Sequence, residues 1–82
     1  MPTKSRKKNG GPRQPVLIAL GERIREMRHR QGYTQAALAE ALDLSVAYVS
    51  LIERGGRNPP FTTVVAIAKA LAVPTARIVV DG

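Results

Sequence analysis

Residues 34–55, TQAALAEALDLSVAYVSLIERG, contain two short helical patterns separated by a break, and this stretch decides the fold. Thr34 precedes the first pattern and Ser45 precedes the second, and both residue types cap the N-termini of helices. The alanines of the first pattern are strong helix formers with little bulk, which lets another helix approach closely. We therefore expect helices at 35–42 and 46–54. Two short helices joined by about three residues form a helix-turn-helix.

A longer helix is expected before this pair, over residues 15–31. Its apolar residues recur at three- and four-residue spacing, which indicates one buried stripe. These residues are Leu17, Leu20, Ile24 and Met27. Pro15 suits the first turn of such a helix, and Gly32 suits its C-terminal end.

Two further helical elements are expected after the pair. A Pro-Pro dipeptide blocks continuation of the preceding helix, and the pattern of residues 61–71 then predicts a fourth helix. Its expected core residues are Val64, Ile67, Ala68 and Leu71. A last short element includes Ile78, and we interpret it as a helical turn. Because residues 77–80 are rich in β-branched side chains, a short strand is the alternative.

The chain of 82 residues has room for one domain. We expect an all-α domain of five helices at 15–82, preceded by a disordered arm at 1–14 that has no apolar periodicity and contains an Asn-Gly-Gly-Pro breaker. The arm holds five of the thirteen basic residues and no acidic residue. These five are Lys4, Arg6, Lys7, Lys8 and Arg13. A net charge of +7 concentrated in this way favours a polyanionic partner, although a solubilising tail has the same composition.

Composition argues against several other classes of protein. The absence of cysteine excludes disulfides, thiol nucleophiles and zinc–thiolate sites. No apolar run approaches the roughly 18 residues that span a bilayer. The basic N-terminus has no apolar signal core, so we expect a cytoplasmic protein with no membrane partner. The single histidine, His29, lies among arginines, and we expect a solvated side chain rather than a metal ligand. No catalytic residue, metal site or cofactor is expected.

The expected helix at 46–54 has an unusual outward face. At about 100° per residue, Val49, Ile52 and Glu53 share the face toward the core. The opposite face is small or apolar, with one charge at its far end, and consists of Ala47, Ser50, Leu51 and Arg54, with Val46 at its boundary near the N-terminus. In a DNA major groove, apolar side chains can contact thymine methyl groups and a serine can hydrogen-bond to base edges. A leucine scattered on the surface is the alternative interpretation of this face.

The whole pattern closely resembles the Cro/repressor (Xre-type) helix-turn-helix family. The matching segments are GERIREMR at 21–28, YTQAALAEAL at 33–42, SVAYVSLIERG at 45–55, Pro59, and AKAL at 68–71. The resemblance covers residues 20–80. It implies a five-helix, lambda-repressor-like domain that binds double-stranded operator DNA as a dimer and regulates transcription.

The resemblance also implies roles for single residues. Gln35 matches a glutamine that contacts a phosphate and braces the reading helix, and Thr34 and the backbone N–H groups at the same helix start add to that phosphate site. Arg28 and Glu53 match a pair that forms a buried salt bridge. Other positions match a phosphate-contacting loop, namely Arg57 and Asn58. Tyr48 has two interpretations, packing at the edge of the core or contact of its hydroxyl with a phosphate.

The sequence departs from the family on the reading helix itself. Positions 46, 47 and 51 often carry glutamine, lysine or arginine in the family, whereas this chain has Val46, Ala47 and Leu51. The expected base-reading set, which also includes Ser50, therefore favours an AT-rich or methyl-dependent site whose shape carries part of the specificity. The basic arm is not part of the family motif, and Arg6 and Lys7 are candidates for a minor-groove contact.

Apolar residues near the chain end predict a homodimer. Phe61 and Val65 lie four residues apart outside the expected core stripe, and Val79 and Val80 follow Ile78. A chain this short cannot bury all of them alone, and a two-fold dimer would present two reading helices to a palindrome. Two other functions remain open: an antitoxin that represses its own operon and binds a toxin protein, and a bridging module that binds no DNA.

Overall fold

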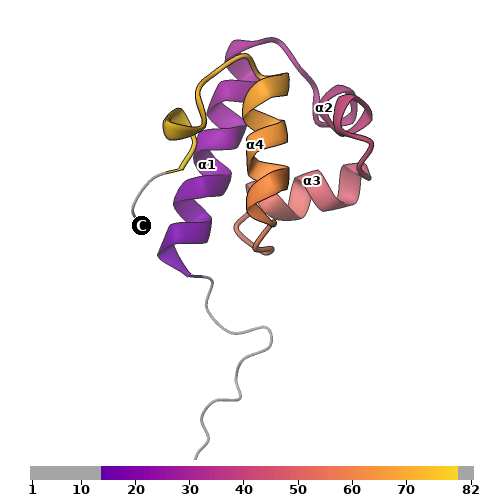
Figure 1. The fold of residues 1–82 in the computed structure, drawn as a ribbon. Helices are drawn as coiled ribbons and strands as arrows, with labels where there is room; N and C mark the ends of the chain where they lie inside the picture. The colour runs from indigo at the N-terminus through magenta and orange to yellow at the C-terminus, as the bar shows by residue number, and fades with distance from the viewer. Residues whose placement is uncertain (1–13, 80–82) are drawn as a thin grey trace, which may run out of the picture.

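The computed structural model describes residues 14–79. This part of the chain is built from four α-helices and one three-residue 3-10 turn and contains no β-strand (Figure 1). The elements are α1 at Pro15–Arg30, α2 at Gln35–Leu42, α3 at Val46–Glu53, α4 at Phe61–Ala70 and the turn η2 at Thr75–Arg77. The predicted all-α class is confirmed. The predicted basic arm, except for residue 14, and Val80 lie outside the described residues.

The helix ends follow from the capping residues. Pro15 occupies the first turn of α1, where its missing N–H would have no partner. The Thr34 hydroxyl accepts a hydrogen bond from the N–H of Ala37 at 2.9 Å, and the Ser45 hydroxyl accepts one from the N–H of Tyr48 at 3.0 Å. Both predicted N-caps are therefore confirmed. Helices α3 and α4 each end one residue earlier than the sequence predicts, because the last residue of each predicted range is the C-cap.

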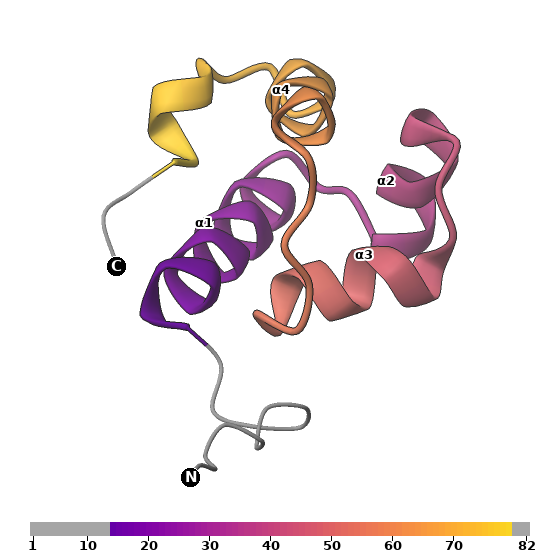
Figure 2. The ribbon, with the colours of Figure 1, turned by 60° about the horizontal axis from the view of Figure 1, so that its bottom comes forward.

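The helices α2 and α3 form the predicted helix-turn-helix. The chain bends by 113° between them, within the range of about 90–120° that is usual for this motif. Asp43 makes the turn by adopting a left-handed conformation at φ 57°, which aspartate tolerates better than most residues. Figure 2 shows α3 on the lower right of α1, on the opposite side of α1 from η2.

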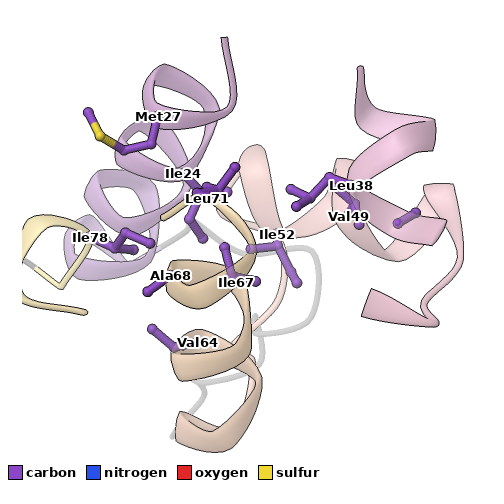
Figure 3. Packing of buried hydrophobic residues seen from close by; sticks show 11 residues of the cluster. Ile24, Met27, Leu38, Val49, Ile52, Val64, Ile67, Ala68, Leu71 and Ile78 are labelled. Atoms are coloured by element: carbon purple, nitrogen blue, oxygen red, sulfur yellow. The ribbon is translucent and has the colours of Figure 1, made fainter. Parts of the chain in front are cut away.

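One apolar core joins all these elements. Ile24 from α1, Ile52 from α3 and Leu71 after α4 point toward one another in Figure 3. The four core positions predicted for α4 are all buried. Leu38 and Val49 extend the core between α2 and α3. The core thereby holds the inner face of α3 and leaves its outer face free.

The predicted fifth helix is shorter than expected. After α4 the chain forms only the single 3-10 turn η2, so the number of α-helices in residues 14–79 is four rather than five. The short strand considered for residues 77–80 is absent from their described part. Ile78 follows η2 and is completely buried in the core. Ile78 anchors this end of the chain, and a single turn is enough to bring its side chain into the core.

Helix α1 approaches α3 very closely at Gly21. A Cβ atom added there would lie 2.5 Å from the carbonyl oxygen of Glu53 and would also overlap that of Ile52. Glycine is the only residue that permits this approach. This close approach sets the distance between α1 and the C-terminal end of α3.

Candidate nucleic-acid interface

The outer face of α3 is open, as the helical period predicts. Val46 is 46% exposed and Ala47 is also exposed, whereas Ser50 and Leu51 are half-buried. Val49 and Ile52 are buried on the inner face. The four predicted base-reading residues therefore share a surface that no other part of residues 14–79 covers completely.

A buried ion pair fixes the inner side of α3 to α1. The Arg28 Nε donates to Glu53 Oε2 at 2.7 Å and Nη2 donates to Glu53 Oε1 at 3.1 Å, so the contact is bidentate. The two side chains are only 8% and 2% exposed. Arg28 Nη1 also donates to the carbonyl oxygen of Tyr33 at 2.8 Å, which ties in the chain before α2. The predicted salt bridge is confirmed, and it links three segments.

Gln35 joins this network directly. Its Nε2 donates to Glu53 Oε1 at 3.0 Å, from the first residue of α2 to the last residue of α3. Contact of Gln35 with a phosphate stays a prediction. The amide has a second N–H, so the bond to Glu53 leaves one donor for a phosphate. The resemblance implies that Gln35 braces the reading helix, and the bond to Glu53 of α3 agrees with that role. The particular partner was not predicted, because the two residues are separated by 17 others and only the fold brings them together.

The candidate phosphate-binding residues lie at two places. Thr34 caps α2, with backbone N–H groups of its first turn beside it. Arg57 and Asn58 lie exposed in the loop between α3 and α4. Tyr48 is half-buried and packs against the core, which supports its packing role without excluding a contact from its hydroxyl.

A shallow hollow, hereafter the α3 hollow, connects the base-reading and phosphate-binding candidates. Ala47, Tyr48 and Leu51 of α3 line it together with Leu44 from the preceding turn. Asp43 and Ser45 before α3 and Arg57 after it complete the lining. The fold thus brings Arg57 beside α3, which the linear sequence did not specify.

The start of α1 lies against the loop that follows α3. The backbone of Gly55 packs on Ile18, and a Cβ atom at Gly55 would lie 3.0 Å from the Ile18 Cα. Gln14, the first described residue, lines the same groove as Asn58. Residue 14, where the described part of the chain begins, therefore lies close to the loop that follows α3.

That groove, hereafter the α1–α4 groove, is mostly apolar. Three strongly exposed apolar residues line it: Val16 at 43%, Phe61 at 69% and Val79 at 48%. Leu17, Leu20 and Val64 form its floor. Val65, which the sequence assigns to the same interface, is half-buried and does not line the groove. The contribution of α1 was not predicted, because Leu17 and Leu20 have the spacing of core positions.

Two other features concern chemistry and membranes. His29 is exposed, and its Nε2 lies 3.1 Å from Arg28 Nη2. Residues 14–79 contain no group of three or more acidic, histidine or cysteine side chains that could hold a metal ion. Within the same residues, no single helix is long and apolar enough to cross a bilayer; α2 and α3 reach that length only as a pair bent by 113°.

Comparison with known proteins agrees with this geometry. Residues 19–78 match a family model described as a helix-turn-helix domain. The chain is 39% identical over 62 residues to the immunity repressor protein of Bacillus phage phi105, an alignment that covers 76% of this chain and 43% of the repressor. The chain therefore spans less than half of that relative.

Two solved structures are similar in fold. The restriction-modification controller protein C.AhdI from Aeromonas hydrophila aligns with a TM-score of 0.73 and 34% identity, over 76% of this chain and 94% of the controller. The master regulator for biofilm formation SinR, solved in complex with DNA, aligns with a TM-score of 0.66 and 31% identity, over 70% of this chain and 92% of SinR.

Proposed function

Because this chain belongs to the helix-turn-helix domain family, we propose that it is a regulator of transcription that binds specific sequences of double-stranded DNA. The protein would act as a repressor or as a controller of its own gene, with α3 in the major groove, and not as an enzyme. This function places it in the cytoplasm with the DNA.

The observation that carries the proposal is the asymmetry of α3. Its inner face is fixed by the core and by the Arg28–Glu53 ion pair, while the outer face, from Val46 to Leu51, remains open. A rigidly held helix with a free outer face is what direct reading of a groove requires, because base contacts depend on fixed geometry. The similar phage repressor and the DNA-bound SinR support this interpretation.

Selection of bound sequences from a random DNA pool tests the function. We expect enrichment of one palindromic sequence with two half-sites about 34–36 Å apart, the spacing of one helical turn. Measured affinity for this operator should exceed that for scrambled DNA by about 10³-fold or more. No enrichment above the starting pool would refute sequence-specific binding.

Replacement of Leu51 by alanine should reduce specificity. If Leu51 contacts a base edge, Leu51→Ala weakens operator binding by about 1–3 kcal/mol and leaves binding to random DNA nearly unchanged. Fluorescence anisotropy with both DNAs measures the two effects. Glu40→Ala, at an exposed position on α2, is the matched surface control. Equal losses on both DNAs would assign Leu51 to folding.

The salt dependence of binding should report the phosphate contacts and the basic arm. Each neutralised phosphate contributes about −0.9 to the slope of log affinity against log salt concentration. Replacing Lys4, Arg6, Lys7, Lys8 and Arg13 by glutamine should flatten this slope if the arm contacts DNA. Arg57→Gln should flatten it by about one unit. A slope that the five arm substitutions leave unchanged would mean that the arm takes no part in binding.

We further propose a homodimer formed through the α1–α4 groove. Phe61 and Val79 are too exposed to contribute to the monomer core, and each contributes apolar surface that a second copy would cover. The groove lies beside the loop that follows α3, so a two-fold contact there would place two copies of α3 near each other. Val65 and Val80 remain proposed members of this interface.

Charged substitutions in the groove should separate dimerisation from folding. We expect Phe61→Glu combined with Val79→Glu to give a folded monomer in sedimentation, because two buried carboxylates on each side would oppose association. Affinity for the palindrome should then fall toward that for random DNA. Thr62→Glu, exposed on α4 beside Phe61 but outside the groove lining, is the control. A double variant that still sediments as a dimer places the interface elsewhere.

A different protein partner is the second candidate for the groove. An antitoxin or a bridging module would use the same apolar surface for another chain. If the parent protein is monomeric at micromolar concentration, binding of another protein in the groove is favoured. If the protein also selects no operator from the DNA pool, the bridging module is favoured over the antitoxin.

A further inference from the structure

Asp43 is the one acidic residue in the lining of the α3 hollow. It lies in the turn before α3, whereas Arg57 lies in the loop that follows the same helix. Both side chains are exposed, and none of the ion pairs within residues 14–79 includes either of them. The hollow therefore carries a negative charge before α3 and a positive charge after it, neither of them neutralised by a partner in the described part of the chain.

The backbone at position 43 does not require a carboxylate. Asp43 ends α2 in a left-handed conformation at φ 57° and ψ 43°, and its N–H donates to the carbonyl oxygens of Ala39 and Glu40. Glycine and asparagine are the usual residues at such a helix end, and neither is charged. The C-terminal end of α2 disfavours a negative charge and the N-terminal end of α3, three residues later, favours one, so the two helix dipoles oppose each other. The structure of the turn therefore does not account for the charge of Asp43.

We propose that Asp43 raises the specificity of DNA binding by keeping backbone phosphates away from the turn between α2 and α3. This inference rests on the proposed DNA-binding function and assigns a role in it to a residue outside the reading helix. The net charge of +7 attracts the protein to DNA of any sequence. Specificity is the difference between the binding free energies for the operator and for other sequences, so a group that weakens only the second increases it.

The two kinds of complex differ in how the protein lies on the DNA. On the operator, base contacts of α3 fix one orientation, with Arg57 at the phosphates and the turn away from them. On other sequences no base contact fixes the orientation, and the affinity is a sum over many arrangements on the backbone. Some of these arrangements bring the turn to a phosphate, where the Asp43 carboxylate repels it. At about 7 Å in water, this repulsion disfavours such an arrangement about threefold.

Replacement of Asp43 by asparagine tests this role. Asparagine tolerates the left-handed conformation as aspartate does, so the substitution removes the charge and keeps the turn. We expect the affinity for scrambled DNA to rise about two- to threefold, and the affinity for the operator selected from the random pool to stay nearly unchanged. The ratio of the two affinities, measured by fluorescence anisotropy at about 0.1 M salt, should therefore fall by the same factor.

Two control variants separate the charge at this position from other effects. Glu22→Gln removes an exposed carboxylate of α1 outside the hollow, so it changes the net charge equally and should leave the ratio unchanged. Asp43→Gly removes the charge and also the strain of the left-handed backbone, so it should stabilise the fold and change the ratio as Asp43→Asn does. Both changes at position 43 should shrink as salt increases, because the Debye length falls from about 10 Å at 0.1 M to about 3 Å at 1 M.

Three results would overturn the proposal. A ratio that Asp43→Asn leaves unchanged would mean that the carboxylate does not distinguish the operator from other DNA. A marked loss of operator affinity in the same variant would assign Asp43 to a base contact, and an equal fall of the ratio in Glu22→Gln would assign the effect to net charge alone. Failure to select any operator refutes the proposed function itself, whereas a selected operator whose preference does not depend on residue 43 refutes only the role of Asp43.

Discussion

Replacing Glu53 by alanine is expected to unfold most of the protein at 37 °C. The change would leave the Arg28 guanidinium buried without its partner, which costs about 3–5 kcal/mol. That loss approaches the whole stability of a small domain, about 5 kcal/mol at the low end of the usual range. The midpoint of thermal unfolding followed by circular dichroism should fall by roughly 15–40 °C.

Two controls test whether the loss of stability comes from leaving a buried charge without its partner. Glu26→Ala removes a carboxylate that bonds Arg23 and Arg30 on the exposed face of α1, and it should cost less than about 1 kcal/mol. Arg28→Met combined with Glu53→Met removes both buried charges and should recover much of the stability, because apolar side chains can replace a buried ion pair. A Glu53→Ala variant that melts within a few degrees of the parent would contradict the role of the pair.

Gly21→Ala is expected to change the stability of the protein strongly, and the sign of the change is itself informative. In the middle of an exposed helix this substitution stabilises by about 1 kcal/mol, because alanine is the better helix former. At Gly21 the new Cβ would meet the carbonyl oxygens of Ile52 and Glu53, which are backbone atoms that cannot move aside alone. We expect a loss of about 1–3 kcal/mol or more, as in other overpacked cores. Thermal melting gives the sign directly.

The same variant should also impair DNA binding. Relief of the clash requires α1 to move away from the C-terminal end of α3, and this displaces the ion pair between Arg28 and Glu53. Operator affinity measured well below the melting temperature should therefore fall more than affinity for random DNA. Gly32→Ala is the control: it strains the backbone at φ 77°, but its Cβ would meet nothing within 4 Å. It should lower stability and leave specificity unchanged. A Gly21→Ala protein more stable than the parent would disprove the close crossing.

The sequence by itself determined the local structure. Thr34 and Ser45 cap the helices that they were expected to cap, since a cap depends only on residues two or three positions away. The spacing of Val49 and Ile52 was sufficient to assign the inner face of α3, because the helical period fixes direction. The Arg28–Glu53 pair was foreseen through the family resemblance rather than from spacing.

Only the tertiary structure decided which faces meet. The approach of Gly21 to the end of α3, the bond from Gln35 to Glu53 and the position of Arg57 beside Ala47 all join residues from different helices or loops. No local pattern encodes such distances, which follow from how the whole core packs. The last element shows the same limit: its β-branched residues allowed a strand or a helix, and burial of Ile78 settled the competition with a single 3-10 turn. The local preferences for helix and strand differ by less than the free energy of burying one large side chain. Tertiary packing therefore decides the structure where local preference and burial conflict.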